Sequence, residues 1–237
     1  MKRYSMIHGL LAAALAVNLT LPVTAAGTSS FTDVSDSNTA LNADILRLMG
    51  VVSGTGGNQF NPNQVLTRAQ FCTMAVNFMG LGDQVVLHST RTIFTDVGPT
   101  YWARGYVNLA SSITIGGTAG ENGGTTGGTR LIMGVGDGTF RPNQAITYGE
   151  AATILMRVLG YGSADVATGS NWYDGYVAVA QSSGLADGLS LGGAATLTRG
   201  QAAILFYNLL FTEPKGSDQV YLTTLGGSLE ENVVVLS

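Results

Sequence analysis

Two arginines stand at helix positions that do not favour a cation. The stretches LTRAQ and LTRGQ begin at Leu66 and Leu197, and a related stretch, ITYGE, begins at Ile146. In each, Thr is followed three residues later by Gln or Glu ahead of an apolar run, which predicts a helix that begins with a capping box. Arg68 and Arg199 then fall in the first helical turn, where the helix macrodipole is positive.

An anion would explain these arginines, because a guanidinium beside the free backbone N–H groups of a helix start concentrates hydrogen-bond donors and positive charge. Pairing with a nearby carboxylate, such as Asp33 or Asp96, would explain them too, and both explanations can hold. The middle copy has Tyr148 at this point, which keeps a hydroxyl donor and an aromatic ring but carries no charge. The predicted capping pairs, which we interpret as structural, are Thr67 with Gln70, Thr147 with Glu150, and Thr198 with Gln201.

These phrases belong to a longer internal repeat. A shift of 80 residues places Phe60 on Phe140 together with eight other identities, and the phrase FTDV recurs after 63 residues. A shift of 70 residues places Trp102 on Trp172. The unequal shifts locate a Gly- and Thr-rich insertion at residues 116–129, which we expect to be a flexible loop.

Each copy predicts a helix, a Gly-rich turn and a second helix. The second helices carry apolar residues at positions i, i+3, i+4, i+7 and i+8, starting from Phe71, Ala151 and Ala202. Such a stripe must be buried against another element. We therefore predict a mainly α-helical fold, with a pseudo-threefold central bundle of three helices and with the first helices and turns outside it.

The N-terminus has the features of a secretory signal peptide. Lys2 and Arg3 precede an apolar run at residues 10–19, and small residues follow, so we expect cleavage after Ala25 or Ala26. The apolar run is too short to span a bilayer as a helix. We expect an exported protein with no membrane span.

The tail differs from the repeats. TEPKGSD is typical of a linker, and QVYLTTL and NVVVLS are rich in β-branched residues, which predicts short strands. We expect this tail to open a further domain of a longer protein. The predicted units are a signal peptide at 1–26, copies at 27–90, 91–163 and 164–213, and the tail at 214–237.

Composition argues against several functions. Charged residues make up 11% of the 237 residues, and removing Lys2 and Arg3 with the leader lowers the formal net charge from −4 to −6, which is unlike a nucleic-acid binder. His88 is the one histidine beyond the leader, and Cys72, the single cysteine, falls beside an apolar stripe as an inert core thiol. No motif suggests catalysis, a metal site or a cofactor. Asp137 is interpreted as a turn residue rather than a calcium ligand.

The order F-x-D-V, W, G-x-G-x-F-x-P-N and T-R-A-E resembles the S-layer homology repeat, in three copies over residues 31–211. That resemblance implies a three-pronged spindle around a three-helix bundle, with sugar bound in grooves between repeats. It implies non-covalent anchoring of an exported protein, at the cell surface, to an anionic secondary cell-wall polysaccharide that typically carries ketal-linked pyruvate. The alternative is a self-assembly or protein–protein module with weak or no sugar binding.

By the same resemblance, Arg68 and Arg199 match the sugar-binding Arg, whose planar fork suits a carboxylate. Tyr148 departs from the motif, copy one lacks the Trp, and copy three lacks F-x-D-V and the P-N turn, so we expect one or two competent grooves. Two further pairs are candidate sugar contacts. Trp102 and Trp172 could stack on sugar, although we favour partly buried core positions for both, and Asp33 and Asp96 could bind hydroxyls, cap the first helix or orient an Arg.

Overall fold

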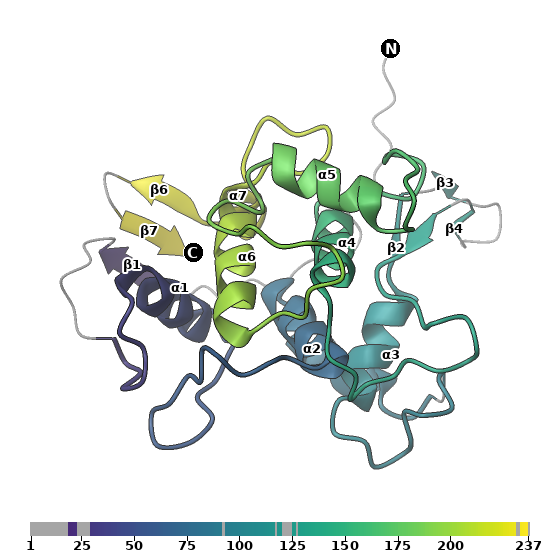
Figure 1. Ribbon diagram of the computed structural model, residues 1–237, viewed down its shortest axis with the longest axis horizontal. Helices are drawn as coiled ribbons and strands as arrows, with labels where there is room; N and C mark the ends of the chain where they lie inside the picture. The colour runs from purple at the N-terminus through teal and green to yellow at the C-terminus, as the bar shows by residue number, and fades with distance from the viewer. Residues whose placement is uncertain are drawn as a thin grey trace.

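Three pairs of helices form the body of the molecule in the computed structural model (Figure 1). The structure describes residues 19–22, 29–91, 93–116, 118–119, 125–126, 128–230 and 233–236. The first helices of the pairs are α1 (Ser37–Leu48), α3 (Arg104–Ser112) and α5 (Asp174–Ser182). The second helices are α2 (Arg68–Phe78), α4 (Tyr148–Val158) and α6 (Arg199–Phe211).

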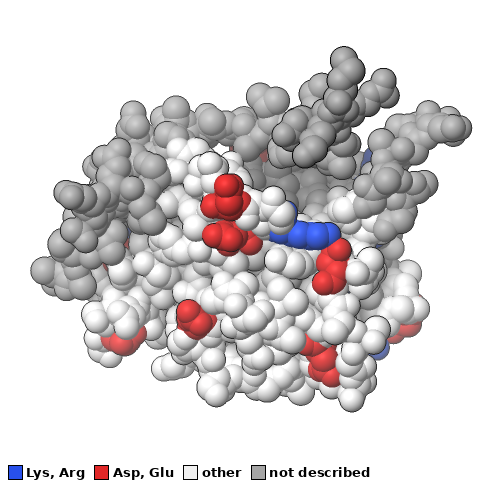
Figure 2. All heavy atoms as spheres, turned by 90° about the horizontal axis from the view of Figure 1, so that it is seen from above, with Lys and Arg blue, Asp and Glu red and all other residues white. Residues whose placement is uncertain are grey.

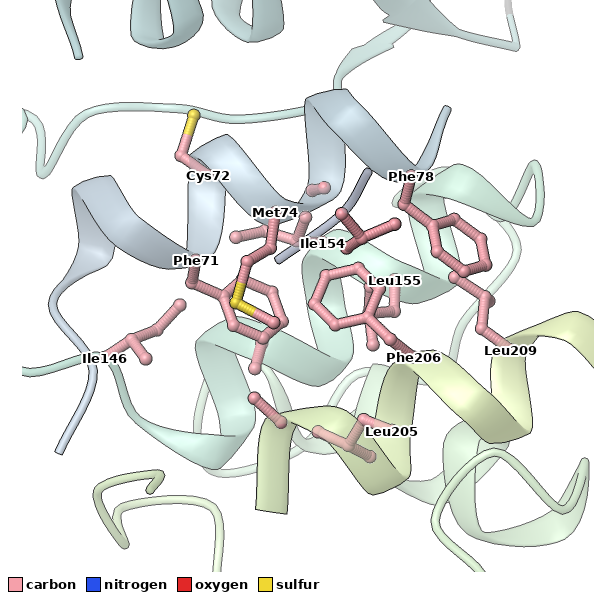
Figure 3. Packing of buried hydrophobic residues seen from close by; sticks show 14 of the residues in the cluster. Phe71, Cys72, Met74, Phe78, Ile146, Ile154, Leu155, Leu205, Phe206 and Leu209 are labelled. Carbon is pink, nitrogen blue, oxygen red and sulfur yellow. The ribbon is translucent and has the colours of Figure 1, made fainter. Parts of the chain in front are cut away.

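The apolar stripes of α2, α4 and α6 meet in the centre, as predicted. Figure 3 shows Phe71 and Phe78 of α2 facing Leu155 of α4 and Phe206 of α6. The ring centroid of Phe206 lies 5.1 Å from that of Phe71 and 5.3 Å from that of Phe78. Full burial of each such side chain stabilises the fold by about 1.5–3 kcal/mol, so the bundle is held mainly by these stripes.

All three predicted capping boxes are present. In each, the Thr side-chain oxygen accepts the N–H of the third helical residue at 3.3 Å. The side chain of that residue accepts the Thr N–H at 2.9 Å in return. The pairs are Thr67 with Gln70, Thr147 with Glu150, and Thr198 with Gln201.

A ring of three backbone hydrogen bonds joins the copies just before these helices begin. The N–H of Leu66 donates to the carbonyl of Leu197, that of Leu197 to Ile146, and that of Ile146 to Leu66, each at 3.0 Å. All three side chains are fully buried. Because the ring closes on itself, it places the starts of α2, α4 and α6 around one pseudo-threefold axis.

The outer helices exchange partners between copies. In Figure 1, α1, α3 and α5 surround the central bundle, and they pack on α6, α2 and α4 respectively. Each first helix thus covers the second helix of the preceding copy instead of its own. No copy buries its apolar stripe alone, and the three must fold together.

Short elements fill the connections. A 3₁₀ helix, η1 (Gly82–His88), packs against α3. Part of the predicted flexible insertion is paired as short antiparallel strands, and its other residues lie outside the described ranges. These strands are β2 (Thr114–Ile115) with β5 (Thr129–Arg130), and β3 (Thr118–Ala119) with β4 (Thr125–Thr126).

The first strand predicted in the tail is instead a helix, α7 (Tyr221–Thr224). Leu222 is fully buried, and the Tyr221 ring stacks on Phe78 with 5.5 Å between centroids. The N–H of Lys215 donates to the carbonyl of Leu159 at 2.8 Å. Packing against the bundle therefore overrides the local β-propensity, and this part of the tail is docked rather than a free linker.

The second predicted strand is confirmed as β7 (Val233–Leu236), which pairs antiparallel with β6 (Ser228–Glu230) and with β1 (Leu19–Pro22). Apart from β1, the predicted signal peptide lies outside the described residues. No helix within the described part of the chain is long and apolar enough to cross a membrane.

Candidate functional site

Each second helix begins against the turn of the next copy. The N–H of Arg68 donates to the carbonyl of Gln144 at 2.9 Å, and that of Ala69 to Pro142 at 3.1 Å. With the capping Thr, these bonds pair the first three N–H groups of the helix. The expectation of free N–H groups for an anion is therefore wrong. The equivalent bonds run from Tyr148 to Ala195, Gly149 to Gly193, Arg199 to Gln64 and Gly200 to Pro62.

The Arg68 side chain is buried inside its junction. Its Nε donates to the Phe140 carbonyl at 2.9 Å, Nη2 to the Met133 carbonyl at 3.3 Å, and Nη1 to Glu150 Oε1 at 2.5 Å. The guanidinium carbon lies 4.7 Å from the centroid of the Phe140 ring. All three nitrogens are engaged, and the paired carboxylate comes from the capping box of α4, not from Asp33 or Asp96.

The Arg199 junction repeats this geometry without a carboxylate. Nε donates to the Phe60 carbonyl at 2.8 Å, Nη2 to the Ser53 carbonyl at 2.7 Å, and the guanidinium lies 4.7 Å over the Phe60 ring. By the repeat, Gln70 takes the place of Glu150. Burial lowers the pKa of Arg199, while the Asp33 carboxylate acts in the opposite direction. An Arg remains protonated at neutral pH even so.

Asp33 and Asp96 hold the turns that these arginines bind. Asp33 accepts the N–H groups of Phe60 and Asn61, both at 2.7 Å, and Asp96 accepts those of Phe140 at 2.8 Å and Arg141 at 2.7 Å. Desolvation tends to raise the pKa of Asp33, but its backbone hydrogen bonds dominate and lower it.

Neither carboxylate caps the first helix, although that was one of their predicted roles. Asp36 caps α1 instead, by accepting the N–H of Thr39 at 2.7 Å. Within the described residues, neither Asp33 nor Asp96 forms an ion pair with an Arg, so each orients its Arg only through the backbone of the turn.

Tyr148 does not reach a ligand. Only 1% of this residue is exposed, and its buried hydroxyl has no hydrogen-bond partner among the described residues. At the same junction, a Cβ added at Gly149 or Gly193 would lie 2.5 or 2.3 Å from the Tyr173 ring. An aromatic ring thus fills the third junction, and the predicted sugar contact of Tyr148 is wrong.

The two tryptophans are exposed, and the expectation that they belong to the core is wrong. Trp102 is 58% exposed and Trp172 is 61% exposed. Their rings contact the preceding or following tyrosine, Tyr101 at 6.0 Å and Tyr173 at 5.5 Å between centroids. Both precede an outer helix, where the indole faces remain free to stack on a ligand.

A cleft of about 500 Å³ opens between the copies beside Arg68. Residues from all three copies line it, and this volume suits a small organic ligand. The sequence pointed to Arg68, Glu150 and Trp172, but it did not point to Arg157, Met133 or Val135 as part of a site. The lining residues include Arg68, Glu150, Arg157, Met133, Val135 and Trp172.

Charge is sparse on the surface. The face in Figure 2 is mostly uncharged, with separate groups of Asp or Glu and few Lys or Arg atoms. Within the described ranges, no group of three or more His, Cys, Asp or Glu side chains could hold a metal ion. Cys72 is buried, and this burial raises the pKa of its thiol to about 12, against the effect of Arg68. Any recognition of an anion must therefore depend on individual cations.

Comparison with known proteins gives the class of this molecule. The model of the S-layer homology domain matches residues 30–72 and 129–152, which contain the first two capping boxes. The chain is 32% identical over 183 residues to a cell surface protein of Thermoanaerobacter kivui, covering 76% of this chain and 21% of that protein. It is 31% identical over 156 residues to a surface layer protein of Brevibacillus choshinensis, covering 66% of this chain and 12% of the relative.

A middle cell wall protein of Brevibacillus brevis is 30% identical over 158 residues, with 66% of this chain and 14% of that protein covered. The chain therefore spans about a fifth or less of the length of these relatives. The fold, the cleft and these relatives define a cell-surface protein. The chain belongs to the S-layer homology domain family.

Proposed function

We propose that this chain anchors an exported protein to the cell wall, without a covalent bond, by binding an anionic secondary cell-wall polysaccharide that carries pyruvate. The observation that carries the proposal is the cleft, which combines guanidinium groups with the exposed indole of Trp172. An indole face can stack on a sugar ring, and a guanidinium binds a carboxylate through its planar fork.

The proposal also treats 27–90, 91–163 and 164–213 as three S-layer homology repeats. The cyclic hydrogen bonds among Leu66, Ile146 and Leu197 support this division, because each copy contributes one equivalent donor and acceptor. Ligand binding is assigned to two junctions at most, since Tyr173 fills the third. The Arg68 junction holds the described cleft, and the Arg199 junction, with Trp102, is its counterpart by the repeat.

The test is co-sedimentation of the protein with cell-wall sacculi, before and after chemical removal of pyruvyl groups. Trp172→Ala and Trp102→Ala should each weaken binding at one junction while leaving the fold intact, because both side chains are largely exposed. Leu87→Ala, at a 76% exposed position outside the cleft, is the matched control.

Two outcomes would count against this function. Equal binding before and after pyruvate removal would eliminate the carboxylate from the recognised ligand. Absence of binding to either preparation would reject wall anchoring by this chain.

The alternative, a self-assembly module, has one supporting observation. Val86 and Leu87 are adjacent on η1 and are 74% and 76% exposed, which suits a protein–protein contact. Sedimentation velocity of the wild type and of a Val86→Ser, Leu87→Ser variant distinguishes the two functions. Self-assembly predicts an oligomer that the variant loses, whereas wall anchoring alone predicts the same species for both.

A further inference from the structure

The cleft contains a cation that the repeated motifs do not include. Arg157 lies on α4 and is only 4% exposed, and its guanidinium carbon is 5.2 Å from the centroid of the Tyr176 ring. Nε donates to the Tyr176 hydroxyl at 3.3 Å, and Nη1 to the carbonyl of Arg130 at 3.0 Å. These contacts fix the orientation of the guanidinium at the wall of the cleft.

The charges in the cleft are not balanced. Two guanidinium groups and one carboxylate line it, and the carboxylate of Glu150 already pairs with Arg68. Among the described residues, Arg157 forms no ion pair, and no hydrogen-bond partner is found for its Nη2. The uncompensated positive charge of the cleft is therefore that of Arg157, and a buried cation without a counterion favours an entering anion.

The other copies show that the fold does not need this charge. By the repeat, Asn77 and Asn208 occupy the position of Arg157. Asn208 donates from Nδ2 to the carbonyls of Leu185 at 3.0 Å and Asp187 at 2.9 Å. Arg157 likewise donates to the carbonyls that follow the outer helix of its own copy. An amide is sufficient for this structural contact, so the positive charge at Arg157 is available for another purpose.

We propose that Arg157, rather than the Arg of the repeated motif, recognises the carboxylate of the bound glycan in this cleft. Arg68 and Glu150 then form a neutral wall beside it, and Trp172 supplies the surface on which the sugar stacks. This inference rests on the proposed function, because it names the residue that makes the cleft selective for an anionic sugar.

The experiment compares binding to intact and pyruvate-free sacculi for the wild type, Arg157→Gln and Arg157→Lys. The wild type should lose at least about tenfold in affinity when pyruvate is removed, as expected for one charge-assisted hydrogen bond. Arg157→Gln should bind both preparations equally and at the pyruvate-free level, whereas Arg157→Lys should keep part of the difference. Arg130→Gln removes an exposed cation outside the cleft and should behave as the wild type.

The outcomes separate the two proposals. If wild-type binding ignores pyruvate, the proposed ligand is wrong. If the wild type depends on pyruvate and a folded Arg157→Gln variant keeps that dependence in full, the role of Arg157 is wrong while the anchoring function stands. Far-UV circular dichroism establishes whether the variant is folded.

A second measurement on the wild type does not depend on that variant. Titration of ¹⁵N-labelled protein with a methyl glycoside that carries ketal-linked pyruvate should shift the Nε–H signal of Arg157, assigned through Arg157→Lys. A shift at Arg68 with no change at Arg157 would overturn the inference.

Discussion

The Arg68 and Arg199 junctions share a scaffold and differ in one acceptor. In both, the guanidinium lies 4.7 Å over a phenylalanine ring, and Nε donates to the carbonyl of that phenylalanine at 2.8–2.9 Å. Only Arg68 has a carboxylate partner, Glu150, and Gln70 stands at the equivalent position beside Arg199. The shared contacts join one copy to the next, whereas the difference is one of charge.

This comparison changes the meaning of the repeated Arg. Its guanidinium is buried and donates to carbonyls of the neighbouring copy in both junctions, so its first role is to hold the copies together. Loss of wall binding in an Arg68 or Arg199 variant would not by itself identify a ligand contact. The exposed tryptophans and Arg157 provide cleaner tests of binding.

The largest expected effect is that of Arg68→Ala. The substitution removes the ring contact and leaves the partly buried Glu150 carboxylate without its partner, which should cost about 3–5 kcal/mol in the free energy of unfolding. Arg199→Ala leaves carbonyls but no carboxylate unpaired and should cost about 1–3 kcal/mol. Urea unfolding followed by circular dichroism measures both.

The matched control is Arg141→Ala, which breaks the exposed ion pair with Asp137 and should cost at most about 1 kcal/mol. Equal costs for Arg68→Ala and Arg199→Ala would show that Glu150 contributes nothing and that the two junctions do not differ in the way proposed here.

Local features of the fold could be predicted because they depend on nearby residues. The capping boxes need only a Thr and a Gln or Glu three positions later, and the bundle follows from the stripes that begin at Phe71, Ala151 and Ala202. The partner of each Arg could not be predicted. Arg68 contacts Phe140, 72 positions away, and Arg199 contacts Phe60, 139 positions away. Cyclic exchange between copies leaves no local signal of this pairing.

The tryptophans show a second limit. A Trp three residues before a Gly recurs at Trp102 with Gly105 and at Trp172 with Gly175. A Cβ at Gly105 would lie 2.5 Å from the Val85 carbonyl, and one at Gly175 would lie 2.1 Å from that of Ala167. The repeated spacing therefore marks a close backbone approach at the Gly. It does not indicate burial of the Trp, although the aromatic residue alone favoured that interpretation.

A smaller effect is expected from the pH dependence of the Arg199 junction. Because backbone hydrogen bonds lower the pKa of Asp33 in the folded state, its stabilising effect is present above the unfolded pKa of about 3.9 and is lost as pH falls through the folded value. Asp33→Asn should flatten the decrease in unfolding free energy below about pH 4, and it should destabilise the protein less than Arg199→Ala does.

Urea unfolding between neutral pH and acid measures this dependence. Asp83→Asn, on η1 and outside both junctions, is the control. A slope for Asp33→Asn that equals that of the wild type would mean that the turn does not depend on this carboxylate.

The caps should respond alike in all three copies. Thr67→Ala, Thr147→Ala and Thr198→Ala each remove one capping hydrogen bond of the same length, 3.3 Å, and should each cost about 1 kcal/mol in thermal unfolding. The matching Thr→Ser variants, which keep a hydroxyl, should stay close to the wild type. A markedly larger cost in one copy would show that the junctions differ in backbone geometry as well as in charge.

The smallest effect on stability, and the sharpest test of the comparison, is expected from Glu150→Gln. Gln70 and Gln201 already complete capping boxes, so the substituted amide should preserve the cap and change the unfolding free energy by no more than about 1 kcal/mol. The substitution gives Arg68 the uncharged environment of Arg199. In this background Arg68→Ala should cost about as much as Arg199→Ala costs in the wild type, a coupling that a double-mutant cycle measures. The cleft would also gain one positive charge, so retention on pyruvate-bearing sacculi should rise. If Arg68→Ala costs the same in the wild type and in the Glu150→Gln background, the ion pair does not distinguish the junctions, and the buried ring and carbonyl contacts alone determine the stability of both.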